Sequence, residues 1–185
     1  EEARVQLLAY YAHKPPEMDV AAIKAARLRH ILFLIERDPK DGFGLFQVVT
    51  GVYSLHCQGD DLADPDGYQQ AASVWREQIK KNSKVEEIKK TAAGFLQFCS
   101  PEEAEQLLIA TNDSAGLGNL YASAILGITG KAYETGDAVA SDPALRQSPF
   151  AEKASRELQQ TADEGVLVQG TTQLFRQGGI VCCAR

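Results

Sequence analysis

The chain has 185 residues, of which 44% are hydrophobic, 24% are charged and 8% are aromatic. The apolar share excludes a disordered chain, and the charged share excludes a membrane-embedded protein. With 19 Lys and Arg against 25 Asp and Glu, the net charge of -6 argues against nucleic acid or anionic lipid as a partner. A chain of this length can bury one core or build a stack of small units. We expect residues 1–185 to form a single domain.

The amino terminus shows no signal peptide, because no basic region is followed by an apolar run and a small-residue cleavage site. Glu1 stands where Met is usual, which predicts a processed or trimmed chain, or a fragment of a longer one, and leaves the compartment open. The most apolar stretch, Ile31 to Ile35, is far shorter than the roughly 20 residues that span a bilayer. We expect no membrane span and interpret this stretch as a buried helix face.

The first well-defined helix is expected from near Asp19 to Asp38-Pro39, because a residue before proline is pushed out of the α region. The next apolar stretch, residues 44–55, contains Phe46 to Thr50, which is β-rich by propensity. A lone strand would leave its backbone groups without hydrogen bonds, and no second strand lies nearby. We therefore predict a helix here too.

The rest of the chain alternates apolar stripes of helical period with short turns. Asp66 is expected to cap the helix that follows residues 58–67. Ser100-Pro101 followed by two Glu residues is typical of a helix start. Further breaks are predicted at Asn82-Ser83, Asn112-Asp113-Ser114 and Ala162-Asp163-Glu164, with a longer connection from Glu134 to Pro149. About nine helices of ordinary length result, which predicts an all-α fold.

The clearest helix hairpin lies between residues 85 and 108. Its first helix carries apolar or small residues at helical spacing: Val85, Ile88, Ala92 and Phe95. After the turn, Ala104 leads the apolar pair Leu107 and Leu108 of the second helix. Because Ala92 and Ala104 are small, two antiparallel helices could approach closely there, with Phe95 and Leu108 filling the space above them.

The following unit contains Leu117-Gly118 and, three residues on, Tyr121. This run resembles the tetratricopeptide repeat, whose first helix carries W-x2-L-G-x2-Y. With Ala104 as the small residue of a second helix, the Trp, Gly and Tyr positions of the preceding unit fall on Ile88, Ala92 and Phe95. The resemblance, to degenerate repeats of the bacterial type, covers residues 82–127. Insertions after Gln58 and Glu134 depart from the pattern, and an irregular helical bundle is the alternative.

The resemblance implies stacked antiparallel helix hairpins, an α-α superhelix, that bind a protein or peptide partner or take part in assembly without catalysis. In such repeats, basic residues on the first helices can grip a peptide carboxylate. The implied peptide-binding residues are Lys84, Glu87, Lys90, Thr91, Asn119 and Ser123. Three of the chain's lysines near them, Lys80, Lys81 and Lys89, complete its basic cluster, which is also typical of a solubilising helix face.

The competing hypothesis is an enzyme, or a small-molecule or metal binder, with an inter-helix pocket near His56, Cys57 and the loop from Asp60 to Asp66. A cysteine nucleophile needs a base and an orienting group within reach, and adjacent residues on a helix point in different directions. An EF-hand loop with Gly67 at position six would place Leu62 where the first oxygen ligand belongs. We therefore predict no catalytic residue, no metal site and no cofactor.

The four cysteines fall into two groups. Cys57 and Cys99 lie near the ends of successive first helices, so a disulfide between them and two buried free thiols both remain open. Neighbouring helix axes lie about 8–10 Å apart, whereas a disulfide needs a closer Cα approach. Cys182 and Cys183 are vicinal and follow Gly178-Gly179 near the carboxyl terminus, with no third metal ligand nearby in the sequence.

Overall fold

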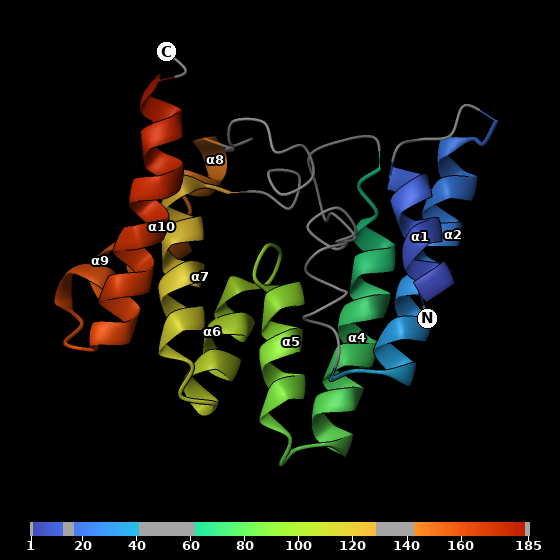
Figure 1. Cartoon of the computed structure of the whole chain (residues 1–185), viewed down its shortest axis with the longest axis horizontal. Helices are drawn as coiled ribbons and strands as arrows, with labels where there is room; N and C mark the ends of the chain where they lie inside the picture. Colours follow the sequence, from blue (N-terminus) through green and yellow to red (C-terminus); the bar gives the residue numbers. More distant parts are fainter. Residues whose placement is uncertain (1, 13–16, 41–61, 129–142, 184–185) are drawn as a thin grey trace. The chain divides into compact units, whose positions relative to one another are not determined.

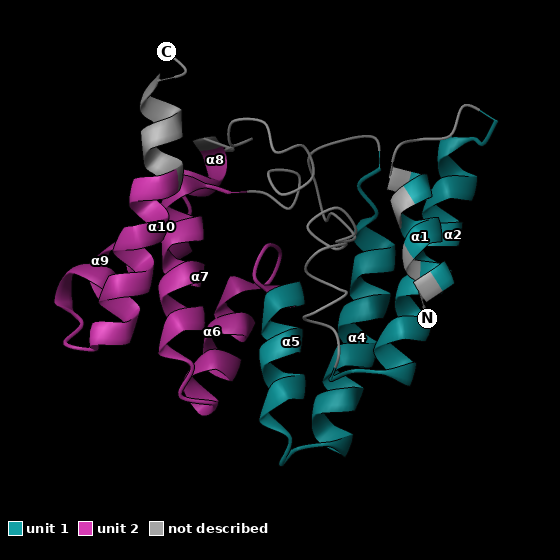
Figure 2. Ribbon diagram, viewed as in Figure 1, with its two compact units in different colours: residues 1–95 teal, residues 96–185 magenta. Residues whose placement is uncertain are grey.

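The structure, a computed structural model, describes residues 2–12, 17–40, 62–128 and 143–183. Every regular element in these ranges is an α-helix, and nine helices lie within them (Figure 1), which confirms the all-α prediction. The predicted helix at residues 44–55 lies outside the described residues. The chain divides into two compact units, residues 1–95 and 96–185 (Figure 2).

The first unit is built around α2 (Val20–Arg37), which packs against both α1 (Glu2–Ala12) and α4 (Pro65–Lys81). It also includes α5 (Glu86–Leu96) up to Phe95. Its buried apolar side chains include Leu8, Ile23, Ile31, Ile35, Tyr68, Trp75, Ile88 and Phe95. The rings of Tyr68 and Phe95 stack with their centroids 5.1 Å apart, which joins α4 to α5.

The limits of α2 agree with the sequence prediction. Asp19 is the N-cap, and its side chain accepts a hydrogen bond of 2.7 Å from the backbone N–H of Ala22. The predicted cap of α4 is wrong. Asp64, and not Asp66, accepts the hydrogen bond of 2.9 Å from the N–H of Gly67. Pro65 suits the first helical position, where no N–H is needed, so the acid directly before it becomes the cap.

The apolar run from Ile31 to Ile35 is only partly a buried helix face. Ile31 and Ile35 are buried, whereas Leu32 is half-buried and Phe33 is 37% exposed. Five successive residues on a helix point all around its axis, since each is rotated by about 100° from the last. The expectation of a buried stretch therefore fails for the residues in the middle of the run.

The second unit is centred on α7 (Ser114–Leu126), which packs against all the other helices of the unit. These are α6 (Pro101–Ala110), α8 (Pro143–Arg146), α9 (Pro149–Gln160) and α10 (Glu164–Cys183). The predicted breaks at residues 82–83, 112–114 and 162–164 are confirmed. The helices predicted at residues 85–108 are α5 and α6; their packing through Ala92 and Ala104 stays a prediction, as does the single domain.

Two glycines let α7 and α10 approach closely. A Cβ added to Gly118 of α7 would lie 2.6 Å from the carbonyl oxygen of Val166 and 2.8 Å from the backbone nitrogen of Gly170. Both are backbone atoms of α10, so they cannot move without moving the helix. Hydrogen bonds on either side of this contact join Ser114 to Asp163 at 2.7 Å and Gln169 to Asn119 at 2.9 Å.

We predict that Gly118→Ala lowers the free energy of unfolding by about 1–3 kcal/mol, because the new methyl group forces α7 and α10 apart. Helix propensity alone would give the opposite sign, a gain of about 1 kcal/mol. Urea unfolding followed by circular dichroism measures the change. Gly116→Ala on the same helix is the matched control and should cost less, since its Cβ meets side-chain atoms of Leu108 and Asp113. A variant at position 118 as stable as the wild type would contradict the close contact.

Candidate functional site

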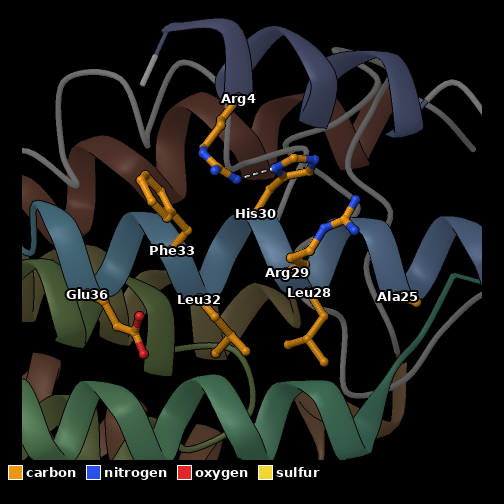
Figure 3. Close-up of a pocket in the computed structure, with 8 residues that line it drawn as sticks. All are labelled: Arg4, Ala25, Leu28, Arg29, His30, Leu32, Phe33 and Glu36. Carbon is orange, nitrogen blue, oxygen red and sulfur yellow. Dashed lines mark hydrogen bonds between the residues drawn. The ribbon is translucent and has the colours of Figure 1, made fainter.

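A groove of about 740 Å³ runs along one side of α2 in the first unit (Figure 3). Six of its lining residues form what we call the outer face of α2: Ala25, Leu28, Arg29, Leu32, Phe33 and Glu36. They recur at intervals of three and one residues, which places them on a single side of a helix. Arg4 of α1 and His30 complete the lining. The groove therefore combines an apolar middle with charged side chains.

The helices α1 and α4 pack on the inner side of α2 and leave its outer face uncovered. Ile23, Ile31 and Ile35 are buried on the inner side, where α1 and α4 pack. On the outer face, Leu28 and Leu32 are half-buried and Phe33 is exposed. The sequence carried a signal for this second stripe in the positions 28, 32 and 33, but we interpreted the whole run from Ile31 to Ile35 as one buried face and assigned no role to Leu28.

Arg4 connects α1 to α2 at the groove. Its Nη1 donates a hydrogen bond of 2.9 Å to Nδ1 of His30, and its guanidinium carbon lies 3.7 Å from the centroid of the Phe33 ring (Figure 3). Tyr11, also on α1, stacks on the His30 ring at 5.9 Å with an interplanar angle of 16°. Because arginine can only donate, Nδ1 of His30 must be the unprotonated acceptor. The contact therefore needs a neutral imidazole.

The electrostatics around His30 favour this neutral form. Burial lowers the pKa of His30 below its ordinary value of 6.5, and the positive charges of Arg4 and Arg29 lower it further. Only 6% of the residue is exposed to solvent. Arg4 and Arg29 thus supply positive charge to the groove, Glu36 supplies negative charge, and His30 supplies none at neutral pH. These groups can bind apolar and charged partner surfaces by contact and hydrogen bonding.

The structure places Lys84 just before α5 and the next three predicted peptide-binding residues within this helix. Lys84 and Glu87 are exposed and Lys90 is half-buried. Thr91 is only 3% exposed, so its hydroxyl is covered within the folded unit. Lys84 and Glu87, with Lys90 beside them, remain available to a partner, and their binding role stays a prediction.

The other two predicted residues, Asn119 and Ser123, lie on α7 in the second unit. They are four residues apart and share one side of the helix. Asn119 accepts the hydrogen bond from Gln169, and Ser123 is 5% exposed with no hydrogen-bond partner for its hydroxyl among the described residues. Ser123 is therefore covered within the folded unit, whereas Asn119 is half-buried and bonded to α10; the binding role of both stays a prediction.

The residues of the enzyme hypothesis are mostly beyond what the structure describes. His56, Cys57, Asp60 and Asp61 lie outside the described residues, and Asp64 is occupied as the cap of α4. Within the described ranges, no three His, Cys, Asp or Glu side chains are placed to hold a metal ion. Cys99 is in a disulfide, so the alternative of a free thiol is wrong for this residue. The side chains of Cys57, Cys182 and Cys183 are not described.

A buried ionic cluster occupies the interior of the second unit. Glu105 of α6 is 4% exposed, accepts a hydrogen bond of 2.8 Å from the hydroxyl of Tyr121 on α7, and forms an ion pair with Lys153 on α9. Burial raises the pKa of Tyr121, and the hydrogen bond to Glu105 raises it further, so the phenol remains a donor. The cluster joins three helices and satisfies its own polar atoms, which is typical of a structural role.

Replacing Glu105 by Ala should lower the free energy of unfolding by about 1–3 kcal/mol, because the buried Tyr121 hydroxyl loses its acceptor. Lys153, whose side chain is 41% exposed, can turn toward solvent and adds little to the loss. Chemical unfolding measures the change. Glu102→Ala, at an exposed position of the same helix, is the control and should cost less than about 1 kcal/mol. Equal losses in the two variants would rule out a special role for the cluster.

None of the helices among the described residues is long and apolar enough to cross a membrane. No protein-family model, no curated protein and no solved structure shows a significant match to this chain. The groove and the cluster are therefore interpreted from their own geometry.

Stability should fall with acidity because of His30. Its pKa is lower in the folded chain than the ordinary 6.5, so below pH 6.5 the unfolded chain binds the proton first. The stabilising contribution is complete above pH 6.5 and is lost as the pH falls from there through the folded-state pKa. Urea unfolding between about pH 5 and pH 7.5 should show this loss.

The matched variant is His30→Asn, whose side-chain oxygen can accept from Arg4 but does not titrate. The difference in stability between wild type and variant should shrink or reverse toward pH 5. Parallel pH profiles for the two proteins would contradict the account of a neutral acceptor at His30.

Proposed function

We propose that this chain is a non-catalytic helix-hairpin module that binds a protein or peptide partner through the outer face of α2. The observation that carries the proposal is the exposure of Phe33 beside Leu28 and Leu32, in a groove that also holds Arg4 and Arg29. An exposed aromatic ring costs solvation free energy unless a partner covers it. Aromatic and Arg side chains are also the residues most often found at the energetic centres of interfaces.

The shape of the site supports a helical partner. A groove along one helix, with apolar side chains at positions i, i+4 and i+5 and charged side chains beside them, suits a helix that lays its own apolar side into it. Kinship with tetratricopeptide-like repeats is part of the same proposal, because stacked hairpins present elongated surfaces for recognition. In that case the exposed residues Lys84 and Glu87 of the α5 region are a second candidate surface.

The test is a selection of helical peptides from a display library on the full chain, followed by affinity measurements. We predict that Phe33→Ser weakens the selected peptides about tenfold or more, because it removes the apolar centre of the groove. Val20→Ser is the matched control, since Val20 lies on the same helix and is exposed to the same 37% but lies outside the groove. It should leave the affinity unchanged.

Two further variants locate any binding that the groove does not explain. Lys84→Glu tests the α5 surface, and Phe175→Ser tests α10, where that ring is 85% exposed. A loss confined to one of these variants, or a selection that yields no binding peptide, would overturn the assignment to the outer face of α2.

A further inference from the structure

The outer face of α2 has a symmetric order of side chains. Leu32 and Phe33 lie at its centre, Arg29 lies three residues before Leu32, and Glu36 lies three residues after Phe33. The two charges are therefore opposite in sign and equally far from the apolar centre. When a second copy of this face is placed antiparallel to the first, each charge therefore lies opposite a charge of the other sign.

The two charges cannot neutralise each other within one chain. Glu36 lies seven positions after Arg29, which corresponds to about 10 Å along a helix axis. Both side chains are exposed, and neither forms an ion pair or hydrogen bond with a residue in the described ranges. Each charge is thus available to a partner at a fixed position on the face.

We propose that the outer face of α2 docks on the same face of a second copy of this chain, with the two α2 helices antiparallel across a twofold axis. The inference rests on the proposed function, since it names the partner of the same groove. Arg29 then faces the second copy's Glu36, and Glu36 faces the second copy's Arg29. Near the axis, the Leu32 and Phe33 side chains of the two copies pack together, which covers the exposed rings.

The charges on the outer face of α2 favour an antiparallel pair of α2 helices over a parallel pair and over other partners. A parallel pair would bring Arg29 against a second Arg29 and Glu36 against a second Glu36. The antiparallel pair replaces both repulsions by attractions, and a twofold interface makes each favourable contact twice. A basic or acidic partner without this alternation would satisfy one end of the face and repel the other.

The twofold symmetry of this dimer also limits its affinity. Arg4 lies at the α1 edge of the face (Figure 3), so the two Arg4 guanidinium groups come to the same edge of the dimer and repel each other. The face also spans only three helical turns, less than a standard interface. We expect a dissociation constant of roughly 10–100 µM, at the weak end of specific interfaces.

The test is sedimentation velocity of the full chain over a concentration series, with charge reversals on the face. Arg29→Glu and Glu36→Arg should each weaken self-association about tenfold or more, because each turns both attractions into repulsions. An equimolar mixture of the two variants should associate about as well as the wild type, because the heterodimer restores both attractive pairs. Arg156→Glu, at an exposed position of α9 in the second unit, changes the net charge as Arg29→Glu does; it is the matched control and should leave association unchanged.

Each result of these measurements supports or overturns the antiparallel dimer. A mixture that associates no better than either variant alone overturns the antiparallel pairing, and so does a wild type that stays monomeric at the highest concentration. If the wild type is monomeric while Phe33→Ser still abolishes peptide binding, this inference fails and the proposed function stands. If Phe33→Ser has no effect in either assay, both fail. Circular dichroism of each variant confirms that the reversals, which are at exposed positions, leave the helices intact.

Discussion

The helix α2 carries more consecutive apolar residues than its buried side can hold, and the surface of the first unit follows from this constraint. The five residues from Ile31 to Ile35 are all apolar, and a helix rotates them by about 100° each, so they cannot share one side. Ile31 and Ile35 turn inward to the side that α1 and α4 cover. Leu32 and Phe33 are left on the outer face. The groove and the proposed interface both follow from this surplus.

Arg4 reduces the apolar surface that Phe33 exposes to solvent, but it leaves part of the ring exposed. Its guanidinium covers part of the Phe33 ring and at the same time holds His30, so one side chain ties α1 to α2 and places charge beside the groove. In the second unit, by contrast, the buried carboxylate of Glu105 has partners on two other helices. The glycine contact between α7 and α10 likewise closes that interior. These contacts hold the helices of the second unit together.

Local signals in the sequence predicted the helices well, whereas contacts between distant residues could not be predicted. Asp19 and the turn residues marked most helix ends because capping acts within one turn. Pro101 marked the start of α6, where Ser100 makes no side-chain capping hydrogen bond. Asp66 was misassigned because two acids flank Pro65, and only their order relative to proline decides the cap. Thr91 and Ser123 were expected at a binding surface, but both are buried, because small polar residues also fit between packed helices. The Arg4–His30 contact joins residues 26 apart, for which no pattern in one sequence gives a signal.

The outer face of α2 is proposed as an interaction surface that a second copy of the chain covers. Photo-crosslinking from position 33 tests it most directly, with benzoylphenylalanine in place of Phe33 and in place of Val20 as the control. We expect intermolecular products from position 33 whose second peptide comes from residues 25–36, and none of this kind from position 20. Products confined to one chain, or the same products from both positions, would contradict it.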